Sequence, residues 1–147
     1  MREILFRGKR IDNGEWIEGS LINDGRCFIA IHPSLAFGPT SKGEINGETL
    51  WGFYPFFEVD PSTVGQYIGL TDKNGKKIFE GDIIHRVSFI GMGYREERGE
   101  VVYRAPVFLA DCKHNRVLHF SQYPTENGDT EVIGNIHDNP ELLEVGE

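Results

Sequence analysis

The stretch QYIGLTDKNGKKIFEGDIIHRV, residues 66–87, decides the fold class because short apolar runs alternate in it with turn residues. Asn74-Gly75 supplies the two positive-φ residues of a type I′ turn, whose twist matches that of the strands it joins. Glu80-Gly81-Asp82 predicts a second tight turn, which leads into a strand over residues 83–87. We therefore expect a hairpin followed by a third strand. The expected cross-strand pairs are Leu70 with Phe79 and Thr71 with Ile78.

The same turn signal at Asn13-Gly14 predicts an N-terminal hairpin. A two-residue turn there places Lys9 opposite Glu18 and Gly8 opposite Gly19. Strand alternation then gives the hairpin one buried and one wet face. The side chains expected on the buried face are Ile4, Phe6, Ile17 and Leu21, and those on the wet face are Arg7, Lys9, Glu18 and Ser20.

The remaining strand signals lie in the C-terminal half of the chain. Apolar runs bounded by turn residues occur at residues 99–103, 107–110, 116–120 and 130–136. Helix is expected only as short turns at Asp60-Pro61 and Asn139-Pro140, where an Asx residue precedes proline. So many short strands indicate a small barrel rather than an open sheet. We predict an all-β fold in which a hairpin layer and connecting segment (residues 1–58) pack on a barrel (residues 59–147).

Composition and charge exclude several classes of protein. The chain has 147 residues, which fits one domain or two small ones, and its 15 basic and 23 acidic residues give a net charge of −8. Residues 117–147 hold seven acids and no Lys or Arg, a balance that works against nucleic-acid binding. No apolar run approaches the ~18 residues of a membrane span, and the start has no apolar signal core. With two lone cysteines, Cys27 and Cys112, these features predict a cytoplasmic protein without membrane contact.

The segment WGFYPFF, residues 51–57, is unusually aromatic. A single strand cannot hide aromatic side chains on both faces unless something covers each face. The segment is therefore either sandwiched between the two halves of the molecule or an exposed interface. The candidate interface residues are Trp51, Phe53, Tyr54, Phe56 and Phe57.

Three blocks of sequence resemble the YopX family, whose members are encoded mostly by phages and prophages. They are FRGKRIDNGEW (residues 6–16), VDPSTVGQYIGLTDKNGKKIFEGDI (residues 59–83) and EVIGNIHDNPELL (residues 131–143). The resemblance does not extend to residues 23–58 or 88–128. It implies an SH3-like barrel in the C-terminal part, and it transfers no catalytic residue because the family has no established activity.

The chemically suggestive clusters lack the partners that their chemistry requires. Asp72-Lys73-Asn74-Gly75 resembles the start of a calcium loop, but position 12 of that loop would be Ile83 instead of Glu. Asp111-Cys112-Lys113-His114 offers a thiol and an imidazole, but no second Cys–His pair completes a zinc site. Gly91-Met92-Gly93 lacks the further glycine of a phosphate loop. We expect no metal, no cofactor and no catalytic residue, while an enzyme built from carboxylates on distant strands stays open.

These observations predict a non-enzymatic protein-interaction module that forms homo-oligomers through the aromatic segment. A host or phage protein is the other partner that we consider. Nucleic-acid binding by a small barrel is the alternative from a different class. It would use the basic residues Lys73, Lys76 and Lys77 beside the aromatic residues Tyr67 and Phe79. The net negative charge of the chain disfavours this alternative.

Overall fold

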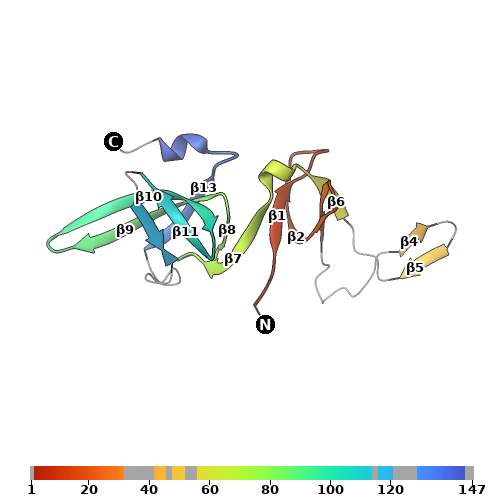
Figure 1. The fold of residues 1–147 in the computed structure, drawn as a ribbon, viewed down its shortest axis with the longest axis horizontal. Helices are drawn as coiled ribbons and strands as arrows, with labels where there is room; N and C mark the ends of the chain where they lie inside the picture. The colour runs from red at the N-terminus through yellow and green to blue at the C-terminus, as the bar shows by residue number, and fades with distance from the viewer. Residues whose placement is uncertain are drawn as a thin grey trace. The chain divides into compact units, whose positions relative to one another are not determined.

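The computed structural model describes residues 2–31, 42–45, 48–51, 56–113, 116–120 and 129–144. No α-helix occurs within these ranges, and the 3-10 helices η1 (Pro61–Thr63) and η3 (Pro140–Leu143) are each a single turn (Figure 1). The prediction of an all-β fold with minimal helix is confirmed. The strands are β1 (Phe6–Lys9), β2 (Trp16–Asn23), β3 (Cys27–Ala30), β4 (Lys42–Ile45), β5 (Glu48–Trp51), β6 (Phe56–Val59), β7 (Gly65–Thr71), β8 (Lys77–Phe79), β9 (Asp82–Ile90), β10 (Gly93–Arg104), β11 (Val107–Cys112), β12 (Arg116–His119) and β13 (Thr130–Asn135).

The chain forms two compact units. Residues 4–64 make the N-terminal unit, and residues 65–147 with residues 1–3 make the C-terminal unit. The division falls after η1, later than the sequence-based boundary between residues 58 and 59. Val59 belongs to the core of the N-terminal unit, and Asp60 caps η1 by accepting a hydrogen bond from Ser62 N (2.9 Å). This arrangement keeps the end of β6 and the 3-10 turn together in the N-terminal unit.

The N-terminal unit is an antiparallel sheet in the order β6-β3-β2-β1 that curls back on itself. The bridge between Arg10 and Val59 and the hydrogen bond from Asp60 N to Lys9 O (2.8 Å) join the chain after β1 to the end of β6. The enclosed core is formed by Cys27, Ile29 and Val59, with Phe6, Ile17, Leu21 and Val64 packed against it. Hydrogen-bonding the two ends of a sheet protects its edges from pairing with other chains.

Two glycines allow this tight closure. A Cβ on Gly19 would lie 1.9 Å from the carbonyl oxygen of Ala30 on the neighbouring strand. A Cβ on Gly8 would lie 2.9 Å from Cγ2 of Val59 in the core. Both distances are too short for an added carbon atom, so the close approach of these strands requires glycine at both positions.

The first hairpin exists, but the predicted register is wrong. Lys9 pairs with Trp16 and Phe6 with Gly19, because a four-residue loop over residues 11–14 replaces the two-residue turn. Gly14 has a positive φ in this loop (72°), and Arg10 O accepts a hydrogen bond from Gly14 N (2.9 Å). The loop is an α-turn between paired strands, a connection that the Asn-Gly signal alone does not distinguish from a type I′ turn.

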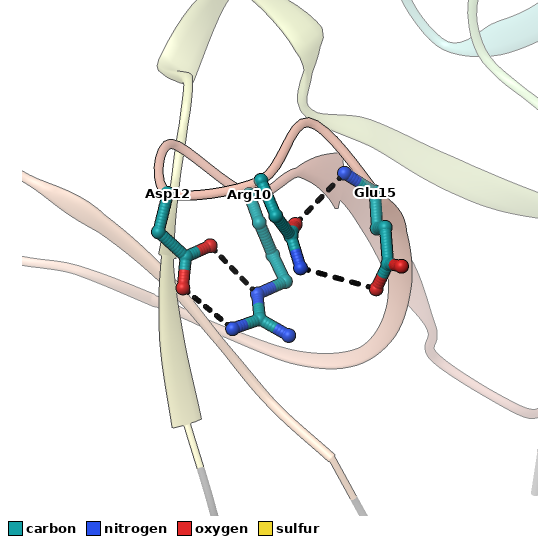
Figure 2. A network of polar contacts seen from close by, with 4 residues as sticks. Arg10, Asp12 and Glu15 are labelled. Atoms are coloured by element: carbon teal, nitrogen blue, oxygen red, sulfur yellow. Dashed lines mark hydrogen bonds and ion pairs between the residues drawn. The ribbon is translucent and has the colours of Figure 1, made fainter.

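Side-chain contacts explain why the longer loop forms. Figure 2 shows Arg10 held by both carboxylate oxygens of Asp12 (2.9 and 2.6 Å) and a second pair of contacts at Glu15. In that second pair, Asn13 Oδ1 accepts a hydrogen bond from the backbone N of Glu15 (2.9 Å), and Asn13 Nδ2 donates to Oε2 of Glu15 (3.1 Å). Asn13 therefore closes the loop through its side chain.

The predicted buried face is mostly confirmed, because the register shift of two residues keeps each side chain on its face. Phe6, Ile17 and Leu21 pack against the core. Ile4 precedes β1 and is 57% exposed, so its assignment to the buried face is wrong. Arg7 is buried rather than wet, since its guanidinium lies over the Trp16 ring (4.8 Å).

The C-terminal unit is built on a five-stranded antiparallel sheet in the order β12-β11-β10-β9-β13. The predicted strands of the C-terminal half lie within these elements, except that those predicted at 116–120 and 130–136 each end one residue earlier in the structure, so the expectation of several strands in this half is confirmed. β9 and β10 are much longer than expected. The core of the unit contains Ile78, Ile84, Val101, Ala110, Cys112, Leu118 and Val132. Closure of this unit into an SH3-like barrel stays a prediction.

The hairpin of β7 and β8 forms, but its register also differs from the predicted one. Thr71 pairs with Lys77 instead of Ile78, and Tyr67 pairs with Phe79, so β7 carries an irregularity between its two paired ends. Gly69 lies within that irregularity at a φ of 91°, which identifies a bulge that only glycine adopts readily. The tight turn predicted at Glu80-Gly81-Asp82 is present, and Asp82 Oδ2 accepts a hydrogen bond from Phe79 N (2.8 Å).

Within the part of the chain that the structure covers, no helix is long and apolar enough to cross a membrane.

Candidate interaction surfaces

The structure describes only part of the aromatic segment, residues 51–57, and its described residues lie on two different strands. Strand β5 pairs with β4 and ends at Trp51, for which only the backbone is described, while Phe53 and Tyr54 lie outside the described residues. On β6, Phe56 and Phe57 point to opposite faces of the sheet, as neighbours in a strand must. Phe56 is 46% exposed, whereas Phe57 lies beneath the guanidinium of Arg10 (3.9 Å).

Phe56 belongs to an exposed aromatic surface on the outside of the N-terminal unit. Its ring meets the ring of Phe28 edge to face at 5.8 Å, and Arg26 lies over Phe28 at 5.1 Å. Ile22 pairs with Phe28 across β2 and β3 and is 46% exposed. Arg26 also forms an ion pair with Glu58 (3.7 Å) at the margin of these rings. We call Ile22, Arg26, Phe28 and Phe56 the outer aromatic surface.

A second exposed apolar feature is the far half of the hairpin formed by β9 and β10. β13 pairs with β9 only as far as Arg86, and β11 pairs with β10 only from Gly99 onward. Among the described residues, the segment 87–96 therefore has strand pairing only within itself, and Figure 1 shows it running past the rest of its sheet. We call residues 87–96 the arm.

The arm carries its apolar side chains where solvent reaches them. Phe89 and Tyr94 are directly opposite each other and are 77% and 68% exposed. Met92, in the two-residue turn at the tip, is fully exposed. Gly91 occupies the first turn position with a φ of 59°, in the positive range that both of the favoured two-residue hairpin turns require there. The sequence signal for this arm was present in the Gly91-Met92 pair between two strand-like runs.

The C-terminal unit also contains an apolar cavity of about 210 Å³. β7, β11 and β12 and the residue after β12 line it with Ile68, Leu70, Val107, Phe108, His119 and Phe120. Phe108 is braced by the ring of Tyr103 at 5.0 Å. No local sequence motif could have identified this cavity, because its walls come from segments that are distant along the chain.

Another cavity, of about 440 Å³, lies beside the first hairpin loop of the N-terminal unit. It is lined by Lys9, Arg10, Ile11, Gly14, Asp60 and Pro61. Its charged groups are already engaged, since Arg10 binds the carboxylate of Asp12 and Asp60 binds both the backbone N and the hydroxyl of Ser62. The ion pair lowers the pKa of Asp12 and raises the pKa of Arg10, so these two groups are charged over the neutral range.

Asp72 has a structural role that explains its place in the β7–β8 turn. Oδ1 accepts hydrogen bonds from the backbone N of Asn74 and of Lys76 (both 2.9 Å), and Oδ2 accepts one from Val132 N (3.0 Å). The carboxylate thus links the turn to β13 by accepting hydrogen bonds from backbone N–H groups. In a calcium loop the same carboxylate oxygens would be ligands of the metal ion. Within the described ranges, no three His, Cys, Asp or Glu side chains lie together as a metal-binding group.

Cys112 is a core residue of the C-terminal unit and not a poised nucleophile. Burial, reinforced by the charges of Glu97 and Asp111, raises the pKa of its thiol to about 11. A thiol with that pKa stays protonated at neutral pH, and the thiolate is the reactive form. His114, which the sequence places two residues away, lies outside the described residues.

Glu100 and Asp111 are directly opposite each other on β10 and β11. Burial and the charge of Asp111 raise the pKa of Glu100, while Asp111 forms an ion pair with Arg104. Paired carboxylates with separated pKa values can serve as a general acid and base. Neither residue lines either of the two cavities described above.

The basic clusters named by the nucleic-acid alternative are largely engaged within the protein. Lys73 forms an ion pair with Glu131 (3.2 Å) and Lys77 with Glu3 (3.0 Å), and Lys77 also lies over the Tyr67 ring at 5.4 Å. Phe79 is 2% exposed, so its ring is not available to stack on a base.

Comparisons with known proteins agree with this architecture. The family model described as YopX protein matches residues 5–144. One similar solved structure is that of protein EF1440 from Enterococcus faecalis, which is 25% identical in sequence. That match covers 97% of this chain and 99% of the other and has a TM-score of 0.58. No curated protein matches the chain.

Proposed function

This chain belongs to the YopX protein family, and from that premise we propose that it is a non-enzymatic protein-interaction module that self-associates. In this proposal it is a phage or prophage product that acts in the cytoplasm, as the family resemblance and the two unpaired cysteines indicate. Its partners are a second copy of itself and a host or phage protein.

The observation that carries the proposal is the outer aromatic surface. Soluble proteins usually keep large aromatic side chains covered, and contiguous exposed apolar side chains rimmed by charges are typical of contact sites. Here Phe56 and Ile22 are each 46% exposed beside Phe28, with Arg26 and Glu58 at the margin. Aromatic and arginine side chains are the types that contribute most to binding energy at interfaces.

A non-enzymatic role accords with the state of the reactive groups. Asp72 and Asp82 use their carboxylates to bind backbone N–H groups, and the Cys112 thiol has a pKa of about 11. The paired carboxylates Glu100 and Asp111 lie beside neither cavity. The two aspartates thus hold backbone segments together and the thiol stays protonated at neutral pH, which leaves surface recognition as the chemistry that the exposed side chains support best.

The test of self-association is the molar mass of the purified protein by light scattering over a wide concentration range. We expect the mass to rise above that of the monomer at high concentration. Phe56→Ser should shift the midpoint about tenfold toward higher concentration, because one exposed aromatic side chain contributes roughly 1–2 kcal/mol at an interface, and 1.4 kcal/mol is about a factor of ten. Ile4→Ser, at another exposed apolar residue of the same unit, is the matched control. A monomer at every concentration would refute self-association.

The wider partner is tested by affinity capture from a host lysate, with and without nuclease, followed by mass spectrometry. A stoichiometric protein that survives nuclease treatment and is lost with Phe56→Ser supports the proposed module. Partners that disappear with nuclease would favour nucleic-acid binding instead, and replacement of Lys73, Lys76 and Lys77 should then reduce binding.

A further inference from the structure

In the part of the chain that the structure describes, the arm is a two-stranded ribbon with no third strand on either edge. Two-stranded hairpins are only marginally stable alone in water, and exposed apolar side chains add a cost in free energy. In this arm Phe89 and Tyr94 are 77% and 68% exposed and Met92 is fully exposed. The tight turn at Gly91 holds these side chains together at the end of the protruding hairpin. Burial of these side chains in an apolar pocket would remove the cost of exposing them to water.

The C-terminal unit, to which the arm belongs, also contains an apolar cavity that could accept an apolar side chain. The cavity of about 210 Å³ is walled by Ile68, Leu70, Val107 and three ring-bearing residues, and five of its six lining residues are apolar. A cavity of ~150 Å³ between apolar side chains is large enough to bind benzene, so this one has room for an aromatic ring or a methionine side chain. Val107 at its mouth is 43% exposed, which leaves the entrance open to solvent.

We propose that the tip of the arm on one copy of this chain inserts into the β7–β11–β12 cavity of a second copy. This inference rests on the self-association proposed above and names a contact that produces it. The tip offers two apolar side chains and Tyr94, whose hydroxyl is its one polar group, and the cavity offers apolar walls with His119 as its one polar side chain. Aromatic rings with a polar end are suited to a pocket of that composition.

The amount of surface involved fits a weak and reversible dimer. A large aromatic side chain buries roughly 150–250 Å² when it is covered, and the tip presents two of them with a methionine. One of these three side chains would fill the cavity while the other two pack around its opening, so reciprocal exchange of two arms would cover on the order of 1,000 Å² in total, the lower limit for a specific interface. Because arm and cavity are different surfaces, the exchange either closes into a symmetric pair or continues into longer assemblies.

The first experiment compares the dimerisation constants of four proteins by sedimentation equilibrium. They are the wild type, the arm variant Phe89→Ser with Met92→Ser, the cavity variant Val107→Lys, and the control Ile4→Ser in the other unit. All four replaced positions are exposed, so the variants should keep the far-UV spectrum and melting temperature of the wild type. We expect the arm and cavity variants each to weaken association at least tenfold and the control to leave it unchanged.

The second experiment identifies the contact directly. Copies carrying Met92→Cys and copies carrying Val107→Cys, with different affinity tags, are mixed under mild oxidation and analysed for disulfide-linked pairs. Both native cysteines are buried, so they should not compete. We expect a cross-link between the two kinds of copy, and none when Ile4→Cys replaces Met92→Cys.

The outcomes separate this inference from the proposed function. A wild type that is monomeric at every concentration overturns both. A wild type that associates, with arm and cavity variants that associate equally well, overturns only the arm-in-cavity contact and leaves the outer aromatic surface as the interface. Links only between two Met92→Cys copies would mean that arms pack on arms, which also overturns it.

Discussion

Asp72 and Val132 are 60 residues apart in sequence and are joined by a hydrogen bond of 3.0 Å from the backbone N of Val132 to Oδ2 of Asp72. The bond fixes the β7–β8 turn against β13, and it is buried. Burial raises the pKa of Asp72, but the N–H donors of Val132, Lys76 and Asn74 outweigh it, and the net pKa is lowered. The ionised carboxylate is therefore the form that holds these two segments together.

This lowered pKa predicts how stability depends on pH. The carboxylate stabilises the fold above its unfolded pKa of ~3.9, and the contribution is lost as the pH falls through the folded pKa. Asp72→Asn should lower the free energy of unfolding by about 2 kcal/mol at pH 7, with a smaller deficit near pH 3. Urea denaturation at several pH values checks this. Asp129→Asn, at an exposed position, is the control, and an Asp72→Asn deficit that stays constant with pH would contradict the role of the charge.

Gly19 predicts a strongly position-specific effect in the N-terminal unit. A Cβ there would lie 1.9 Å from Ala30 O, so Gly19→Ala must push β2 and β3 apart. We expect a loss of about 3 kcal/mol, the upper part of the range for overpacked sites. Glu18→Ala, at the exposed neighbouring position in the same strand, should change the urea midpoint little. Equal midpoints for the two variants would show that the strands can separate at small cost.

Gly99 and Cys112 are paired across β10 and β11 and should be energetically coupled. A Cβ on Gly99 would lie 2.7 Å from Sγ of Cys112. Gly99→Ala should therefore destabilise the protein less in a Cys112→Ala background than in the wild type, where the sulfur occupies the space. A double-mutant cycle in urea measures the coupling, which we expect to be about 1 kcal/mol. Additive effects would place the clash on the backbone of Asp111 instead.

The raised pKa of the Cys112 thiol predicts low reactivity in the folded protein. With a pKa of about 11, less than about 1% of the thiol is ionised at pH 8. Alkylation by iodoacetamide at pH 8, followed by peptide mass spectrometry, should modify Cys112 much more slowly in buffer than in 8 M urea or so, where an ordinary pKa is restored. Rapid modification in buffer would refute this and would reopen a chemical role for the residue.

Much of the secondary structure follows from local sequence. Turn residues at Glu80-Gly81-Asp82 and apolar runs between them identify the strands, because turn propensity and side-chain alternation are properties of a few adjacent residues. The inward orientation of Phe6, Ile17 and Leu21 follows from the same alternation. The family of the chain was also recognisable from its sequence blocks.

The register of the hairpins could not be predicted from the Asn-Gly turn signals, because it depends on side-chain contacts that these two-residue signals do not specify. Asn13 uses its side chain to close a four-residue loop, and Gly69 introduces a bulge in β7. The Asn-Gly pairs at residues 13–14 and 74–75 look alike in sequence, yet neither forms the expected two-residue turn. Each choice is made by the packing of the strands on their cores, which sums over residues far apart in the chain.

The all-β class, most of the strands and the aromatic run over residues 51–57 thus follow from the amino-acid sequence alone. Only the tertiary structure decided which of these aromatic side chains faces solvent, since Phe56 and Phe57 differ by the side of β6 on which they lie. It also decided where β9 and β10 lose their neighbours and where β7, β11 and β12 enclose a cavity. Exposure and enclosure depend on which distant segments come together, whereas strand and turn propensity depends on neighbours along the chain.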